Sequence, residues 1–439
     1  MMKPARPAES KGTAKSALDA NGREKPELKH DTGEMEVILA ESYFLVAQDK
    51  STVLYDLRAK RILQRQAPEQ AWKSTSLYSD LGFRLAEYQN RVFLGRALAA
   101  GGIKAPDMLA MGEPFELQTL FGLVLPDPQH APPISIKPEL EKDGSWIFKQ
   151  GGAEAAYFKP SQTEMPSLLR EMALRWLAYR TRLHPEIRRQ IAAQSQVPEM
   201  LRTHWANTGT MGTTTLVLQS VSLLDGNAHE PKDAQHVGVN AEGELLALVH
   251  ASQDANRRAL CPSLESASKF ADQSVAAKCP LDGLLGLFEV MFQSGDKVVD
   301  EVKRLRPQIE KDPQCKRFFA AINQQNKEAC KRSVELLRSF DRKGLTKDYI
   351  LDIHLADALS TLGQGEEAKQ LFMGILKRNP FLAGVWNDLG QQYQSEYDMG
   401  KAWLCWDLAR RIAPQHPMLA GVTRNELRME HDFPDFFLP

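Results

Sequence analysis

Residues 383–414 read AGVWNDLGQQYQSEYDMGKAWLCWDLARRIAP, and the spacing of large and small residues in this stretch decides the fold of the C-terminal half. Gly390 and Ala402 are small enough to let two antiparallel helices approach closely, while the aromatic residues fill the space between turns. The positions that carry this pattern are Trp386, Leu389, Gly390, Tyr393, Ala402, Trp406, Ala409 and Pro414.

The same pattern partly returns 34 residues earlier in the chain. The matching positions are Leu355, Ala356, Ala368, Phe372 and Pro380. One helical hairpin cannot bury its own apolar face, so neighbouring hairpins must stack. The spacing therefore predicts two stacked hairpins, at 349–382 and 383–416, followed by a capping helix at 417–431.

This pattern resembles the signature of the tetratricopeptide repeat family over residues 347–417, with Trp406 at a position where that family usually has Phe. The resemblance implies a helical solenoid in which the first helix of each hairpin lines a concave, peptide-binding groove. Carried over position by position, the residues that face this groove are His354, Asp357, Asn387, Gln391 and Gln394. Polar side chains there suit an extended peptide, so the implied partner is another protein or peptide and the implied role is that of a scaffold without a cofactor.

The chain changes character near residue 225, from alternating strand-like runs to helical periodicity. We therefore expect an α+β fold, in which an antiparallel sheet rich in β-hairpins and its packing helices precede an all-α solenoid. The expected parts are a disordered tail at 1–33, an α+β domain at 34–225, a linker and connecting segment at 226–262, and a helical domain at 263–439.

Runs of β-branched and aromatic residues between polar turns predict the strands of the α+β domain. They lie near residues 37–39, 43–46, 52–55, 61–63, 115–125, 146–148 and 155–158, with a final hairpin across 201–223. Helical stripes are expected from Ser76 to Gly101 and through 168–183. The helical domain is expected to begin with helices at 263–278, 281–294, 296–310, 313–326 and 328–341.

The end of the chain carries the apolar residues Met429, Phe433, Phe436 and Phe437. We expect them to close the exposed face of the last hairpin, because the terminal unit of a solenoid needs a cap. A docking peptide for another protein is the alternative interpretation.

Composition and charge exclude several classes of partner. The 439 residues include 55 basic and 56 acidic side chains, so no global basic field favours nucleic acid. No apolar run reaches the roughly 18 residues that a membrane-spanning helix needs. The first thirty residues lack the apolar core of a signal peptide, so we expect a cytoplasmic protein, or a periplasmic one if a leader has been removed. The oligomeric state stays open.

No catalytic or metal-binding motif is evident, so we expect neither a catalytic residue nor a metal site. The five cysteines, Cys261, Cys279, Cys315, Cys330 and Cys405, form no CxxC pair, and we expect buried thiols. Disulfides among the first four stay open as an alternative. An enzyme whose catalytic residues follow no familiar motif, within residues 36–225, also stays open.

A third class of function is a carrier or binding protein for a small apolar ligand. The hairpin-rich first half loosely resembles the half-barrel domains that shield apolar ligands in bacterial envelopes. An apolar cavity between the sheet and the helix at 76–100 would favour this alternative, whereas a tightly packed core would count against it.

Overall fold

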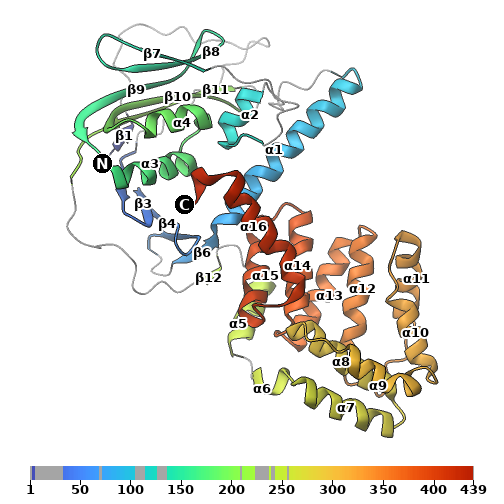
Figure 1. Ribbon diagram of the computed structural model, residues 1–439. Coiled ribbons are helices and arrows are strands. Elements are labelled where there is room, and N and C mark those ends of the chain that lie inside the picture. Colours follow the sequence, from blue (N-terminus) through green and yellow to red (C-terminus); the bar gives the residue numbers. More distant parts are fainter. Residues whose placement is uncertain are drawn as a thin grey trace. The chain divides into compact units, whose positions relative to one another are not determined.

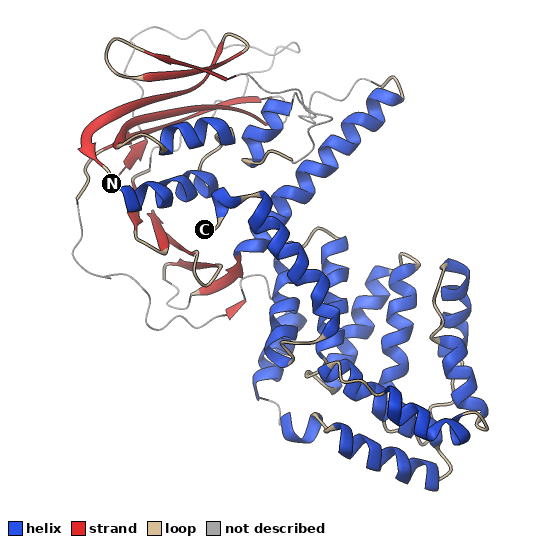
Figure 2. Cartoon of the chain, viewed as in Figure 1, coloured by secondary structure: helices blue, strands red, loops and turns tan. Residues whose placement is uncertain are grey.

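The computed structural model describes residues 2–4, 33–68, 72–103, 114–125, 136–207, 210–222, 237–238, 243–254 and 257–438. It has the α+β fold that the sequence predicts, with an antiparallel sheet in the N-terminal half and a run of helices in the C-terminal half (Figures 1 and 2). The contacts divide the chain into two compact units. The first comprises 1–77, 84–236 and 430–439, and the second comprises 78–83 and 237–429.

The first unit is built on one antiparallel sheet whose strands follow the order β6-β5-β4-β3-β2-β1-β11-β10-β9-β8-β7. Its strands are β1 (Met2–Pro4), β2 (Met35–Leu39), β3 (Tyr43–Gln48), β4 (Ser51–Asp56), β5 (Arg61–Gln66), β6 (Lys73–Ser76), β7 (Ile136–Leu140), β8 (Trp146–Gln150), β9 (Ala153–Glu164), β10 (Gln196–Asn207) and β11 (Thr210–Leu218). Most neighbours in the chain are neighbours in the sheet, as short hairpin connections require.

The hairpins between β3, β4 and β5 show how the sequence sets the register. Asp49 and Lys60 adopt positive φ angles of 52° and 57° in the two connecting turns, at the polar breaks that predicted them. The resulting pairing places Leu45 opposite Leu54, and Leu54 opposite Leu63. These leucines form one apolar cluster with Tyr43 and Trp72 on a single face of the sheet.

Two segments of the first unit differ from the prediction. Residues 2–4 were expected in a disordered tail, but they form β1 between β11 and β2, because backbone hydrogen bonds need no apolar side chains. Residues 115–125 were expected as a strand, but α2 (Pro114–Phe121) is a helix that begins at its proline. A short apolar run does not distinguish a buried strand from a buried helix.

The helices α1 (Leu77–Ala100), α3 (Ser167–Arg180) and α4 (Pro185–Ala192) accompany the sheet. α3 packs against β2 and β3. Phe44 of β3 stacks on Tyr55 of β4 with ring centroids 4.3 Å apart, and Tyr179 of α3 lies 5.0 Å from Tyr55. Aromatic rings therefore fill the space between α3 and this region of the sheet.

The last residues of the chain also belong to the first unit. Residues 434–436 form the short helix η2 (Pro434–Phe436), which packs on α3. Asp435 forms a buried ion pair of 2.8 Å with Arg188 of α4, and Phe436 meets Tyr179 edge-on with centroids 5.0 Å apart. The apolar residues Phe436 and Phe437 thus enter the first unit, whereas the sequence assigned them to the cap of the helical domain. The sequence of such a short terminal segment does not indicate which distant surface its apolar residues contact.

Apart from the two-residue strand β12 (Val237–Gly238), the described elements of the second unit are helices. Its helices are α5 (Gly243–Asp254), α6 (Arg257–Leu260), α7 (Leu264–Ala276), α8 (Pro280–Ser294), α9 (Val299–Ile309), α10 (Pro313–Ala321), α11 (Lys327–Arg338), α12 (Tyr349–Thr361), α13 (Gly365–Arg378), α14 (Ala383–Ser395), α15 (Met399–Ile412), η1 (Pro417–Leu419) and α16 (Ala420–Asp432). The five helices predicted between 263 and 341 are present as α7 to α11. Of the linker and connecting segment predicted at 226–262, residues 226–236, 239–242 and 255–256 lie outside the described residues, and α5 and α6 occupy its second half.

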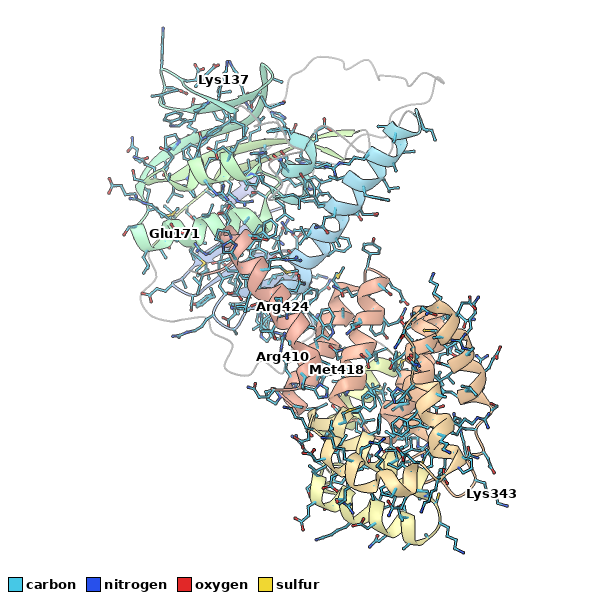
Figure 3. The ribbon with its side chains drawn as sticks, turned by 45° about the vertical axis from the view of Figure 1, so that its right-hand side comes forward. Lys137, Glu171, Lys343, Arg410, Met418 and Arg424 are labelled. Atoms are coloured by element: carbon cyan, nitrogen blue, oxygen red, sulfur yellow. The ribbon has the colours of Figure 1, made fainter. Side chains whose placement is uncertain are left out.

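The helices α12 to α15 repeat with a fixed period. α12 begins at Tyr349 and α14 at Ala383, while α13 begins at Gly365 and α15 at Met399, so both pairs are 34 residues apart. Successive helices from α10 to α15 pack against one another, which makes a stack of three helical hairpins. Arg410 of α15, which Figure 3 labels, pairs with Glu426 of α16 at 2.5 Å, and this ion pair attaches the last helix to the stack.

Close packing inside the last hairpin depends on the small residues of the pattern. A side chain at Gly390 would lie 2.5 Å from the indole nitrogen of Trp406 and 3.1 Å from the carbonyl oxygen of Ala402, so only glycine fits there. Ala402 is fully buried. Every position of the pattern is buried except Pro414, which lies beyond the end of α15 and is exposed.

Candidate binding face of the helical unit

The five residues predicted to face a groove lie on the first helices of two hairpins. His354 and Asp357 are on α12, and Asn387, Gln391 and Gln394 are on α14. Gln391 is exposed, Asp357 and Gln394 are half-buried, and Asn387 is fully buried. The structure therefore brings the five residues to adjacent helices but gives them different access to solvent.

Helix α8 covers a portion of this face. It packs against α10, α12 and α14, the first helix of each hairpin, and runs across the stack (Figure 1). Phe288 and Phe292 of α8 meet the ring of His354 edge-on, with centroids 5.9 Å and 5.6 Å away. Because α8 and the first helices share this face, a partner has access only to the area that α8 leaves open.

Neighbouring aromatic side chains enclose His354, so its ring is not open to a partner. Phe318 of α10 lies 5.5 Å from its ring on a further side, and its Nε2 atom has no hydrogen-bond partner. Burial lowers the pKa of His354 to about 4, since the enclosed ring cannot be hydrated as a cation. The histidine is therefore neutral at pH 7 and acts as a packing residue beneath α8.

Two carboxylates fix α8 in place. Asp282 accepts hydrogen bonds from the backbone amides of Thr346 and Lys347 at 2.8 Å and 3.0 Å, which satisfies donors near the start of α12. Glu289, 1% exposed, accepts hydrogen bonds from the Tyr349 hydroxyl and from Asn379, and pairs with Lys347 at 2.7 Å. These contacts make α8 an integral element of the helical unit.

Beyond His354, the face carries two carboxyl groups on neighbouring helices. Asp357 of α12 and Asp388 of α14 repel each other, and within the described residues of the chain neither forms an ion pair. The Asn387 amide donates to Asp388 Oδ1 at 3.2 Å, whereas Asp388 Oδ2 and Asn387 Oδ1 are buried without a hydrogen-bond partner. Such buried atoms without a hydrogen-bond partner retain most of their desolvation cost.

Sequence reasoning missed Asp388. The residue lies one period of 34 after His354, so the position that singled out His354 also singles out Asp388. Its neighbour Asn387 was predicted as a groove residue, and Asp388 was not. The functional interest of Asp388 arises from its proximity to Asp357 on a different helix, which the sequence does not state.

The carboxyl pair predicts a specific pH dependence of stability. Burial raises the pKa of Asp388 to about 7, and burial and the charge of Asp388 raise that of Asp357. A carboxyl group whose pKa is higher in the folded state stabilises the fold below the unfolded pKa, and this contribution is lost as pH rises through the folded value. We expect Asp388→Asn to increase the free energy of unfolding by about 1–3 kcal/mol more at pH 8 than at pH 5.

Thermal melts of both proteins across pH 5 to 8 measure this difference directly. Comparison with wild type removes the opposite contribution of His354, which is lost as pH falls below its ordinary pKa and is the same in both proteins. Glu335→Gln on the exposed surface of α11 removes the same charge and is expected to leave the pH profile unchanged. Equal gains for Asp388→Asn at both pH values would refute the raised pKa.

The first unit contains a cavity at one end of its sheet. A cavity of about 410 Å³ lies at the end of β2 to β5, and most of its lining is polar or charged. Its lining residues are Glu34, Glu36, Ala47, Gln48, Asp49, Lys50, Ser51, Thr52, Arg65, Ala67 and Pro68. It is not the apolar cavity between sheet and α1 that a carrier requires, and aromatic rings fill the space under α3.

Three further observations bear on chemistry. Among the residues that the structure describes, no group of three or more His, Cys, Asp and Glu side chains is placed to hold a metal ion. No helix in the described ranges combines the length and apolar character needed to cross a membrane. All five cysteines are free thiols, and burial raises the pKa of Cys315 and Cys405, which keeps these two protonated at neutral pH.

Comparison of the whole chain with protein-family models, curated proteins and solved structures gives no significant match. The functional argument therefore depends on the geometry of the helical unit.

Proposed function

We propose that the chain is a non-catalytic protein that binds a polypeptide through its helical unit, whose hairpins are of the tetratricopeptide type. The observation that carries the proposal is the polar face of α12 and α14, where Asp388 Oδ2 and Asn387 Oδ1 are buried and unpaired. A folded domain rarely leaves such atoms without partners, and binding of an external donor removes the cost.

The repeat geometry supports the same proposal. Helices that recur at a period of 34 residues present equivalent side chains at regular intervals along one face, which suits an extended chain. Because α8 covers the area near His354, the bound segment is expected to contact the C-terminal halves of α12 and α14. Gln391 is the most exposed of the predicted residues there.

The test uses the full chain as bait in a pull-down from native extract, with single substitutions on two neighbouring hairpins. Gln391→Arg places a bulky cation on the proposed face, whereas the matched control Gln370→Arg places one on the exposed surface of α13. We expect wild type and Gln370→Arg to recover the same partner and Gln391→Arg to lose it. Equal recovery by all three proteins would show that this face is not the binding surface.

A chain shortened before the repeats is a poor test of this proposal. Such a chain would also lack η2, which packs on α3 in the first unit. Lost binding would then report damage to the first unit as readily as the absence of the face. Point substitutions avoid this ambiguity.

A further inference from the structure

The cavity at the end of β2 to β5 has small residues at its centre and charged residues at two sides. Ala47 of β3 and Thr52 of β4 are paired in the strand register. The register places Glu36 of β2 beside Ala47, and it places Arg65 of β5 beside Thr52. Directly paired residues point to the same face of a sheet, so the four side chains form one row. In this row two short side chains lie between a carboxylate and a guanidinium group, and all four residues line the cavity.

This row lies on the face of the sheet that does not meet α3. Ala47 packs against the apolar cluster that contains Leu45 and Leu54. Side chains alternate between the two faces along a strand, so Phe44 is on the opposite face, where its ring lies 6.0 Å from that of Tyr179 of α3. The cavity is therefore separate from the aromatic packing under α3.

The charged side chains of the row do not neutralise each other. In the described part of the chain neither Glu36 nor Arg65 forms an ion pair, and Lys50, which also lines the cavity, forms none either. The guanidinium carbon of Arg65 lies 5.0 Å from the centroid of the Trp72 ring. A cation–π contact positions the guanidinium group but leaves its N–H donors available. A carboxylate from another molecule can therefore bind Arg65 where it already lies.

The distance between the two charged sides limits the size of a ligand that bridges them. Glu36 and Arg65 are three strand spacings apart, which is about 14 Å between their backbones. Side chains project roughly perpendicular to a sheet, so the charged ends keep a similar separation. With about 3 Å taken by each charged contact, roughly 8 Å remains between the charged groups of the ligand. Two extended amino-acid residues span about 7 Å.

We propose that this cavity binds a zwitterionic peptide of about two residues, with its ammonium group at Glu36 and its carboxylate at Arg65 and Lys50. The lining carries three carboxylates and two cations, so an anionic ligand meets repulsion and a singly charged cation leaves Arg65 unmatched. The hydroxyl group of Thr52, at the centre of the row, can bond the peptide amide. The volume of about 410 Å³ lies within the range of small-ligand sites, about 300–1,000 Å³.

Capped and uncapped dipeptides test the two ends of the site separately. The probe is L-alanyl-L-alanine. Its N-acetyl derivative lacks the ammonium group, and its C-terminal amide lacks the carboxylate. Binding to the full chain is measured by calorimetry at pH 7 and low salt, where exposed charges are screened least. We expect saturable binding of the free dipeptide and at least tenfold weaker binding of each capped form.

Single substitutions then assign each end to a residue. In Glu36→Gln the free and acetylated dipeptides are expected to bind alike, while the free dipeptide keeps its advantage over the amide. In Arg65→Met the free dipeptide and the amide are expected to bind alike, while the advantage over the acetylated form remains. The matched controls are Glu41→Gln and Arg58→Met, at exposed positions in turns at the other end of these strands, and both are expected to behave as wild type does. Each variant loses one preference and keeps the other, which general damage to the fold would not produce.

Several results would overturn the assignment. They are the absence of saturable binding by the free dipeptide, equal affinity for free and capped dipeptides, tighter binding of the acetylated form than of the free one, or retention of both preferences in both variants. The site belongs to the first unit and the polypeptide-binding face to the second, so the dipeptide titration and the pull-down with Gln391→Arg test the two proposals independently.

Discussion

A chain that ends at Asp432 is expected to lose the folded structure of its first unit. The deletion removes Asp435, whose carboxylate pairs with Arg188 at 2.8 Å and with Arg189 at 3.1 Å. Arg188 is 1% exposed, so the deletion leaves a guanidinium group buried without its counter-ion. Breaking a buried ion pair from one side costs about 3–5 kcal/mol.

The same deletion removes two buried aromatic side chains. Phe436 and Phe437 are 1% and 2% exposed, and the ring of Phe436 lies against Tyr179 of α3. Loss of one buried phenylalanine costs about 3–5 kcal/mol. The backbone carbonyl groups of these residues also accept hydrogen bonds from Tyr179 and Arg175, at 3.0 Å and 2.7 Å. The combined loss approaches the whole stability of a typical domain, about 5–15 kcal/mol.

Hydrogen exchange measures this outcome locally. Amide protection in β3 and β4 is expected to fall in the shortened chain, because these strands pack against the α3 residues that η2 supports. Asp435→Asn is expected to cost about 3 kcal/mol, whereas Asp432→Asn, which affects only a contact with the exposed His431, is expected to cost under about 1 kcal/mol. Unchanged protection in the shortened chain would show that residues 433–439 are dispensable for the first unit.

How far the sequence predicted this molecule depends on the range of the interactions concerned. The hairpins from α12 to α15 begin where the repeated pattern places them, since the spacing of Gly390, Ala402 and Trp406 encodes contacts between neighbouring helices. Turn residues similarly set the β3–β4–β5 meander. Local chemistry thus determined the elements.

The sequence pattern did not predict contacts between residues that are far apart in the chain. The sequence marked α8 as a helix, but nothing in its composition indicated that Phe288 and Phe292 would cover His354. The destination of Phe436 was equally open, because an aromatic residue packs against any apolar surface of suitable shape. The carboxyl pair was missed for the same reason, as Asp357 and Asp388 meet only when their helices are adjacent.

The second large effect is expected at Ala402. This residue is fully buried on α15, and its carbonyl oxygen would lie only 3.1 Å from a side-chain carbon at Gly390 of α14. Ala402→Glu forces a longer side chain and a charge into a contact that excludes even one methyl group on the facing helix. Overpacking costs about 1–3 kcal/mol, and an unpaired buried charge about 3–5 kcal/mol, so a loss of several kcal/mol in the free energy of unfolding is expected.

The consequence of Ala402→Glu extends beyond its own hairpin. In a stack of hairpins each unit is stabilised by its neighbours, so the damage to α14 and α15 also exposes the face that α12 and α13 bury against them. Urea titration followed by far-ultraviolet circular dichroism gives the free energy of unfolding, and Ala320→Glu, at an exposed position of α10, is the matched control with an expected change within about 0.5 kcal/mol. Equal midpoints for the two variants would mean that α14 and α15 do not meet at Ala402, which would remove the geometric basis of the repeat assignment.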